Sequence, residues 1–464
     1  MADLPLEMVL AATGGRLVGE KVSPVLRGVS TDTRTLEVGS LFVALRGERF
    51  DAHDFVGEAF KRGAAAALVS REVQAQPLIV VDDTLEALGA LAAAHRRTVS
   101  PKVISITGST GKTTTKEMVA GILSQGWKTA RTPGNYNNEV GVPLALLELD
   151  EGYEAVVVEL AMRGAGQIGY LARMAQPQVG VITNIGISHL ELLGSKEAIA
   201  EAKAELLANL PESGTAVLNG DDEFLGYLSE RSPCRVVSFG RGEKADVRAD
   251  RVAVRGDGTI EFALRGWWGE ERIALRAPGR HHAMNAAAAA AAAMAAGAQA
   301  EWIAPGLEHF EGAEMRSRIV RAPSGVMVID DCYNAAPDSM RVALELLADL
   351  PGRDKWAVLG DMKELGPLSP EWHREVGELA GDVGVAGVIA LGELGHFIAE
   401  GAREDLPAEN VLEAADNAEA AAIVADLLAA GDVVLVKGSR AMKMEEVVER
   451  LLRPETWQSE RGDE

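Results

Sequence analysis

The chain of 464 residues has little cysteine, fewer basic than acidic residues, and no long uninterrupted apolar segment. Two cysteines, Cys234 and Cys332, cannot form a disulfide framework and favour a reducing compartment. The longest apolar run, 286–296, is too short and too rich in alanine to cross a membrane. The first residues include acids and no basic segment, which argues against a signal peptide. We therefore expect a soluble, cytoplasmic protein without membrane insertion.

The second scarcity is positive charge: 46 lysines and arginines face 69 acidic residues, a net charge of −23. Such a surface repels polyphosphate backbones, so general binding of nucleic acid is not expected. An acidic ligand would therefore need a local basic cluster. Apolar content of 47% is ordinary for a globular protein. The length predicts about three domains.

Apolar strand-like segments alternate with helical patterns over most of the chain. In the middle these segments are 103–106, 155–160, 179–183 and 215–218, and after Arg316 they are 326–330, 356–359, 387–391 and 433–436. This alternation predicts an α/β fold with parallel sheets covered by helices on both faces. A more polar, strand-rich insert at 235–275 and a closely packed alanine helix at 285–296 lie between the two series.

The first hundred residues mix short strands (41–45, 64–69 and 78–81) with helices. A helix at 85–98 ends before Ser100-Pro101, which we interpret as a linker. The chain has no G-x-G-x-x-G fingerprint, so a nicotinamide site is not expected. Repeats of solenoid length are not visible either.

A phosphate-binding turn, Thr-Gly-Ser-Thr-Gly-Lys-Thr at 107–113, follows the apolar strand 103–106 and leads into helical spacing. Backbone N–H groups and a helix N-terminus at such a turn favour an anion. Gly108 and Gly111 allow close approach, Lys112 can reach the terminal phosphates, and the Thr113 hydroxyl can ligate Mg²⁺. Full P-loop spacing would place glycine where Ile106 stands. The segment predicts a nucleoside triphosphate site.

Three further residues are candidates at neighbouring positions. Glu159 ends the strand 155–160 and His189 follows the strand 179–183, and ligands gather at the carboxyl ends of parallel strands. Glu159 could hold Mg²⁺ there, but a solvated strand-end acid fits its position equally well. By pattern alone, Lys203 is an ordinary surface lysine on a helix.

These motifs together resemble the ATP-dependent Mur ligases of peptidoglycan synthesis, whose turn has the same short Gly-x-x-Gly-Lys-Thr form. The similarity includes the segments 184–195 (NIGISHLELLGS) and 197–206 (EAIAEAKAEL). Within that family the match is closest to the MurF type, which adds D-alanyl-D-alanine. Seven ordered segments carry this narrower resemblance: 30–34, 41–55, 132–147, 278–286, 330–340, 359–366 and 436–445.

The resemblance implies a three-domain α/β architecture. It assigns 1–99 to an N-terminal domain that binds the UDP substrate, 100–314 to a central ATP-binding P-loop domain with a parallel sheet, and 315–464 to a Rossmann-like domain that binds the amine. The implied reaction joins D-alanyl-D-alanine to UDP-N-acetylmuramoyl-tripeptide through an acyl phosphate, with ATP and Mg²⁺. We expect a monomer. The third residue of the acceptor peptide, diaminopimelate or lysine, stays open.

The resemblance also assigns site residues. Lys112, His189 and Lys203 are the implied catalytic residues, and Lys203 is implied to carry a carbamate. The metal ligands are Thr113, Glu159, His189 and Lys203. The ATP-binding residues are Gly108, Ser109, Thr110, Gly111, Lys112, Thr113, Thr114, His281, Asn285, Arg316 and Asp331. The UDP-substrate residues are Ser30, Asp32, Arg34, His53, Asn135, Asn137 and Asn138.

Two positions depart from the family pattern: Ala336 replaces asparagine in Asn-Ala-Asn-Pro, and His282 replaces asparagine in a His-Asn pair. The alternatives are a MurE-type ligase, a folylpolyglutamate synthetase, a nucleotide switch or motor, and a noncatalytic scaffold. The 30–34 segment argues against the synthetase, and the 330–337 loop argues against MurE. GTPase base-reading motifs are absent from the sequence, and the P-loop lysine is present, which disfavours the last two.

Overall fold

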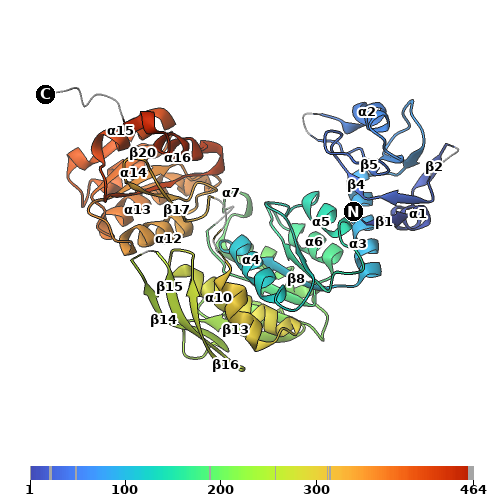
Figure 1. The fold of residues 1–464 in the computed structure, drawn as a ribbon, viewed down its shortest axis with the longest axis horizontal. Coiled ribbons are helices and arrows are strands. Elements are labelled where there is room, and N and C mark those ends of the chain that lie inside the picture. Colours follow the sequence, from blue (N-terminus) through green and yellow to red (C-terminus); the bar gives the residue numbers. More distant parts are fainter. Residues whose placement is uncertain are drawn as a thin grey trace.

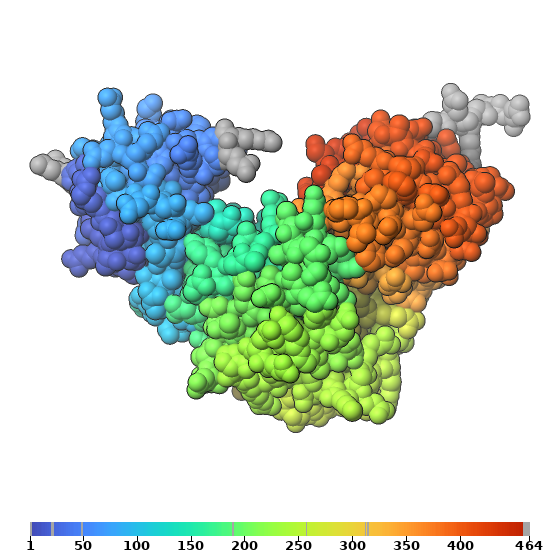
Figure 2. Space-filling model, turned by 180° about the vertical axis from the view of Figure 1, so that it is seen from behind, coloured from blue at the N-terminus to red at the C-terminus, as the bar shows by residue number. Residues whose placement is uncertain are grey.

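The computed structural model describes residues 2–19, 23–47, 50–187, 190–256, 258–310, 312 and 315–457. Three α/β units follow one another along the chain, and each has its own sheet. The N-terminal and C-terminal units stand on either side of the central one (Figure 1). Figure 2 shows the surface hollowed between these two outer units, above the central unit. The predicted α/β class is confirmed.

The N-terminal unit contains a five-stranded sheet in the order β2-β7-β6-β5-β4, parallel except for the β2–β7 pair. Its strands are β2 (Arg16–Val18), β4 (Val29–Ser30), β5 (Leu41–Val43), β6 (Ala66–Val69) and β7 (Leu78–Val80), with β1 (Asp3–Pro5) paired to β3 (Val25–Arg27) beside them. The helices are α1 (Leu6–Thr13), α2 (Val56–Lys61) and α3 (Thr84–Val99). The predicted strands and the predicted helix at 85–98 are confirmed within about two residues.

Helix α3 joins the first unit to the second. The Asp83 side chain caps its first turn, and Ser100 ends it in the left-handed region with φ 54°. The helix packs on α1 and also on two helices of the central unit. Its Arg96 guanidinium donates to the carbonyls of Ala175 (2.9 Å) and Gln176 (3.0 Å). Because these contacts cross the predicted boundary at 99/100, α3 holds the first unit against the second.

The central unit has a nine-stranded sheet in the order β16-β15-β14-β13-β12-β11-β8-β10-β9. Its strands are β8 (Lys102–Thr107), β9 (Thr129–Arg131), β10 (Ala155–Glu159), β11 (Val179–Ile182), β12 (Thr215–Asn219), β13 (Arg235–Gly240), β14 (Val247–Val254), β15 (Ile260–Gly266) and β16 (Gly269–Leu275). The pairs up to β13–β14 are parallel, and β14–β15 and β15–β16 are antiparallel. The polar insert therefore extends the central sheet.

Helices cover this sheet: α4 (Lys112–Leu123), α5 (Gly141–Leu147), α6 (Gln167–Ala175), α7 (Leu190–Leu193), α8 (Lys196–Ala204), α9 (Leu225–Glu230), α10 (His281–Ala296) and α11 (Ile303–Glu308). The alanine helix α10 begins four residues earlier than predicted. Its alanines at 286–293 are fully buried. Small side chains allow this helix to pack closely on α4, which starts at the phosphate-binding turn.

The C-terminal unit restarts the pattern with a sheet in the order β17-β18-β22-β19-β20-β21. Its strands are β17 (Arg318–Arg321), β18 (Met327–Asp330), β19 (Lys355–Gly360), β20 (Gly387–Leu391), β21 (Val411–Ala414) and β22 (Val433–Lys437). Its helices are α12 (Pro337–Asp349), α13 (Ser369–Asp382), α14 (Gly395–Ala402), α15 (Asn417–Leu427) and α16 (Glu445–Leu451). All pairs are parallel except β17–β18, so the second predicted parallel sheet is confirmed.

Polar contacts hold the C-terminal unit on the central one. The Arg280 side chain forms an ion pair with Asp349 (2.7 Å), and the Ile187 N–H donates to the Asp338 carboxylate (2.7 Å). The second contact places the N-terminus of α12 over the loop that follows β11. In the described part of the chain, no helix is long and apolar enough to cross a membrane.

Candidate active site

The phosphate-binding turn connects β8 to α4 at the middle of the central sheet. Gly108 and Gly111 have positive φ values of 148° and 78°, which disfavour residues with a Cβ. A Cβ on Gly111 would also lie 2.5 Å from the Asn285 amide oxygen on α10. The turn is therefore pressed between α10 and the end of β11. The predicted Gly108 and Gly111 roles agree with this crowding.

The loop after β11 braces the turn from the side. The Asn184 amide accepts from the Thr110 N–H (3.0 Å) and donates to the Thr110 hydroxyl (2.8 Å). The Ser109 hydroxyl donates to the Gly186 carbonyl (3.0 Å) and accepts from its N–H (2.9 Å). These bonds preorganise the turn for an anion. Asn184 was missed as an individual residue, although β11 lies beside β8 and its position at the strand end is the signal that could have found it.

Lys112, at the start of α4, bends back over the turn. Its ammonium donates to the carbonyls of Gly108 (2.8 Å) and Ser109 (3.1 Å). Burial lowers the pKa of Lys112 to about 8. The nearby Glu159 carboxylate acts to raise this pKa, and the Arg316 guanidinium acts to lower it. The charged form is thus poorly solvated here. A phosphate in the turn would supply the missing negative charge.

Glu159 ends β10 next to this turn and is almost completely buried. Its carboxylate accepts from the Thr113 hydroxyl (2.8 Å) and from the Asn137 amide (2.9 Å). The alternative of a solvated strand-end acid is therefore wrong. Mg²⁺ prefers hard oxygen ligands, and a hydroxyl beside a carboxylate is a donor pair that suits it. Thr113 and Glu159 fit a magnesium site.

Lys203 lies on α8 with 2% of its surface exposed, so its interpretation as an ordinary surface lysine is wrong. Burial lowers the pKa of the Lys203 amine well below its usual value, and the Lys112 ammonium lowers it further. Among the described residues, none forms a hydrogen bond or ion pair with this amine. A neutral amine is the form that adds CO₂, so the environment fits the implied carbamate.

His189, the fourth implied metal ligand, lies outside the described residues. Within the described ranges, no three His, Cys, Asp or Glu side chains cluster as a metal site would require. Of the four implied ligands, Thr113, Glu159 and Lys203 lie among the described residues.

Residues of α10 and of the C-terminal unit approach the same turn. Burial lowers the pKa of His281 to about 4, against the effect of Asp331. The Asp331 carboxylate accepts from Lys437 (2.7 Å) and from the Ser317 N–H (3.0 Å). The Arg316 guanidinium lies 4.1 Å from the Tyr333 ring centroid.

The structure thus brings to one region four residues that the resemblance assigns to ATP: His281, Asn285, Arg316 and Asp331. Lys437 was missed as an individual residue, although it stands in the 436–445 segment that carried the resemblance.

A cavity of about 610 Å³ lies between the N-terminal unit and the central unit, where it is lined by α5 and the loop before it. The loop at 133–138, which we call the asparagine loop, supplies part of its wall. Four predicted UDP-substrate residues line the cavity: Ser30, Asp32, Asn135 and Asn138. The structure therefore brings together residues that lie more than a hundred positions apart in sequence.

The other three predicted UDP-substrate residues lie elsewhere. Arg34 is exposed and forms an ion pair with Asp32, whose pKa this hydrogen bond lowers to about 2. His53 is buried, with one ring nitrogen 2.6 Å from Asp51 and the other accepting from the Ser70 N–H (2.9 Å). Asn137 turns away from the cavity to hold Glu159.

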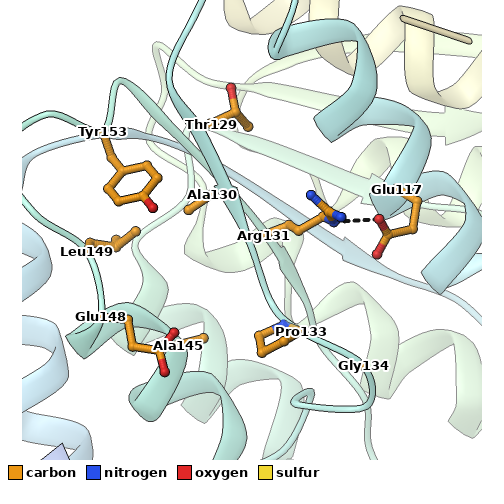
Figure 3. Close-up of a pocket in the computed structure, with 10 residues that line it drawn as sticks. All are labelled: Glu117, Thr129, Ala130, Arg131, Pro133, Gly134, Ala145, Glu148, Leu149 and Tyr153. Carbon is orange, nitrogen blue, oxygen red and sulfur yellow. Dashed lines mark ion pairs between the residues drawn. The ribbon is translucent and has the colours of Figure 1, made fainter. Parts of the chain in front are cut away.

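A second cavity, of about 410 Å³, flanks the sheet-edge strand β9. Figure 3 shows Arg131 turned toward Glu117, with which it forms an ion pair of 2.5 Å, and Tyr153 on the other side of the strand. None of the predicted site residues belongs to its lining, but Glu148 lines both cavities.

Comparison with known proteins places these features in one family. Three family models match in chain order: the Mur ligase family catalytic domain (25–96), the Mur ligase middle domain (106–293) and the Mur ligase glutamate ligase domain (315–440).

A curated relative from Bacillus subtilis, named UDP-N-acetylmuramoyl-tripeptide–D-alanyl-D-alanine ligase, is 40% identical over 92% of this chain and 93% of its own. The crystal structure of MurF from Acinetobacter baumannii is 34% identical, with a TM-score of 0.91 over 97% of this chain and 99% of its own. MurF ligase from Thermotoga maritima, solved in complex with ADP, is 30% identical, with a TM-score of 0.83 over 93% of this chain and 98% of its own. The chain, with its three α/β units and its braced phosphate-binding turn, belongs to the Mur ligase family.

Proposed function

We propose that this protein uses ATP to join D-alanyl-D-alanine to UDP-N-acetylmuramoyl-tripeptide. One observation carries the proposal: a single loop contributes to the interdomain cavity and also contacts the carboxylate beside the phosphate-binding turn. Asn135 of the asparagine loop lines the interdomain cavity, while Asn137 of the same loop holds the carboxylate that contacts the phosphate-binding turn. A UDP-linked acceptor in the cavity would therefore lie next to ATP. The name of the Bacillus subtilis relative supports the identity of both substrates.

The reaction needs activation because a carboxylate is a poor electrophile. An oxygen of the tripeptide carboxylate attacks the γ-phosphorus of ATP, the bond to ADP breaks, and an acyl phosphate forms. The amine of D-alanyl-D-alanine then attacks the acyl carbon, the amine loses its proton, and inorganic phosphate leaves. Lys112 and the backbone N–H groups of the turn stabilise the negative charge on the transferred phosphoryl group.

Magnesium would be held by Thr113, Glu159 and carbamylated Lys203, with His189 as the further proposed ligand. When bound, it would neutralise charge between the phosphates and the acceptor carboxylate. Glu159 is already oriented for this by Asn137. Burial, together with the charge of Lys112, disfavours the ammonium form of Lys203, which supports the proposed carbamate.

Arg316 and Asp331 would complete the nucleotide site from the C-terminal unit, with His281 and Asn285 on the adenine side. Closure of the units over ATP would also keep water from the acyl phosphate. We further propose a cytoplasmic monomer, and the two free cysteines fit the reducing compartment of this proposal.

The test is release of phosphate from ATP by the purified protein, with the product identified by mass. We expect release only when both UDP-N-acetylmuramoyl-tripeptide and D-alanyl-D-alanine are present. Diaminopimelate with the UDP-dipeptide, and glutamate with a folate, test the MurE-type and folylpolyglutamate synthetase alternatives. Turnover with either of these pairs, and not with the first, would overturn the proposal.

A further inference from the structure

Lys116 is a buried lysine that the proposed reaction does not use. It lies on α4, one turn beyond Lys112, and its side chain is fully shielded from solvent. Burying a charge is unfavourable unless partners compensate for it. Its ammonium has three partners from three elements: the Gly134 carbonyl (3.3 Å), the Glu117 carboxylate (3.3 Å) and the Glu159 carboxylate (3.7 Å).

The partners of Glu159 show that Lys116 is not needed merely to satisfy that carboxylate. Thr113 and Asn137 already donate one hydrogen bond to each of its oxygens. What Lys116 adds is the carbonyl of Gly134, at the start of the asparagine loop. This loop is thus tied to Glu159 twice, by Lys116 at one end and by Asn137 at the other.

The asparagine loop also forms part of the interdomain cavity, through Asn135 and Tyr136. A ligand that fixes these two residues fixes their chain neighbours, Gly134 and Asn137. Through them it would restrain the Glu159 carboxylate, which contacts Thr113 in the phosphate-binding turn. Ordering by the first ligand lowers the ordering cost that a second ligand meets, and this makes binding cooperative without a large movement.

We propose that Lys116 is a positioning residue that couples occupancy of the interdomain cavity to occupancy of the phosphate-binding turn, by holding the asparagine loop against Glu159. The names of the two ligands rest on the proposed function; the coupling rests on the contacts of Lys116. The coupling is reciprocal, so each ligand raises the affinity for the other by the same factor.

The test compares the affinity for UDP-N-acetylmuramoyl-tripeptide with and without saturating ADP and Mg²⁺, by isothermal titration calorimetry. In the unmodified protein ADP should tighten binding at least about fivefold. Lys116→Met removes the charge and retains an unbranched apolar chain, so its ratio should fall to about one while it still binds ADP. Lys102→Met, which changes an exposed lysine at the start of β8, is the matched control and should keep the full ratio.

Two results would overturn the inference: a ratio of one in the unmodified protein, or an unchanged ratio in Lys116→Met. A failure of the unmodified protein to bind the UDP-tripeptide at all would overturn the proposed function and this inference together. Binding of both ligands without coupling would overturn only the role of Lys116.

A measurement on the unmodified protein covers the case in which Lys116→Met does not fold. Hydrogen exchange of the amides at 134–138 should slow at least about fivefold when ADP and Mg²⁺ bind, because the coupling orders this loop from the nucleotide side. Exchange that is the same with and without the nucleotide would contradict the coupling.

Discussion

Nucleotide binding should depend on pH through Lys112. The pKa of this amine is about 8 in the nucleotide-free protein, since burial disfavours the charged form. Phosphates in the turn favour the charged form and raise the pKa. Protein whose Lys112 is neutral must therefore take up a proton when ADP binds.

The magnitude follows from the fraction of protein that is already protonated. With a pKa of about 8, roughly three-quarters of the Lys112 amines are charged at about pH 7.5 and roughly one-tenth at about pH 9. The affinity for ADP should fall by about eightfold over this interval, or about 1.3 kcal/mol. His281 does not contribute, because its pKa of about 4 leaves it neutral throughout.

Isothermal titration calorimetry in two buffers of different ionisation enthalpy, at constant Mg²⁺, measures the affinity for ADP and the number of protons taken up on binding. The number of protons taken up per ADP bound should rise from roughly a quarter at about pH 7.5 to roughly nine-tenths at about pH 9. Lys112→Arg, whose charge does not titrate here, should show a flat affinity and no uptake. Equal pH dependence in the unmodified protein and in Lys112→Arg would refute the reasoning.

The same pKa shift has a consequence for stability. A lysine whose pKa is lowered by folding destabilises the protein while it is charged, and this cost disappears as pH rises from about 8 towards its unfolded value. Nucleotide-free Lys112→Met should therefore be more stable than the unmodified protein near neutral pH, by up to about 3 kcal/mol in urea unfolding. The difference should shrink as pH rises through about 8 to 10.

Three further predictions concern the reaction and the core. Lys203→Ala and Lys203→Arg should both lose most ligase activity, measured as phosphate release, and added acetate should restore part of it only in the alanine variant; a fully active Lys203→Arg would contradict the carbamate. The amine substrate should be D-alanyl-D-alanine, so faster coupling of free glutamate or diaminopimelate would overturn the assignment. Ala289→Leu should lower the unfolding free energy by about 1–3 kcal/mol in a denaturant titration, because α10 has no room for a larger side chain; unchanged stability would show that it has.

The sequence was sufficient for the strands, helices and phosphate-binding turn because these depend on local patterns. Strand β8, the glycines after it and Lys112 form one continuous signal, and their placement is as predicted. The sheet to which the 235–275 segment belongs was not predictable in this way. Whether β13 pairs with β12 or starts a separate sheet depends on contacts that periodicity does not encode.

The directions of side chains were the harder part of the site. Asn135, Asn137 and Asn138 are the same residue type within one short loop, and the resemblance assigns all three to the UDP substrate. In the structure only Asn135 and Asn138 line the cavity, since the backbone turns Asn137 towards Glu159. His53 likewise satisfies both ring nitrogens within the N-terminal unit. A single sequence gives residue types and spacing, but not which way each side chain points inside a loop.

The charge distribution gives the physical reason for the form of the site. The chain as a whole is strongly acidic, with a net charge of −23, so an anionic ligand requires a local excess of positive charge. Lys112 and Lys116 both interact with the buried Glu159. Burial lowers the pKa values of Lys112 and Lys203, and the neighbouring charges of Arg316 and Lys112, respectively, lower them further. A polyphosphate supplies negative charge beside Lys112, so part of its binding free energy comes from stabilising the charged form of this lysine. A site arranged in this way favours ATP over neutral ligands before any base-specific contact is made.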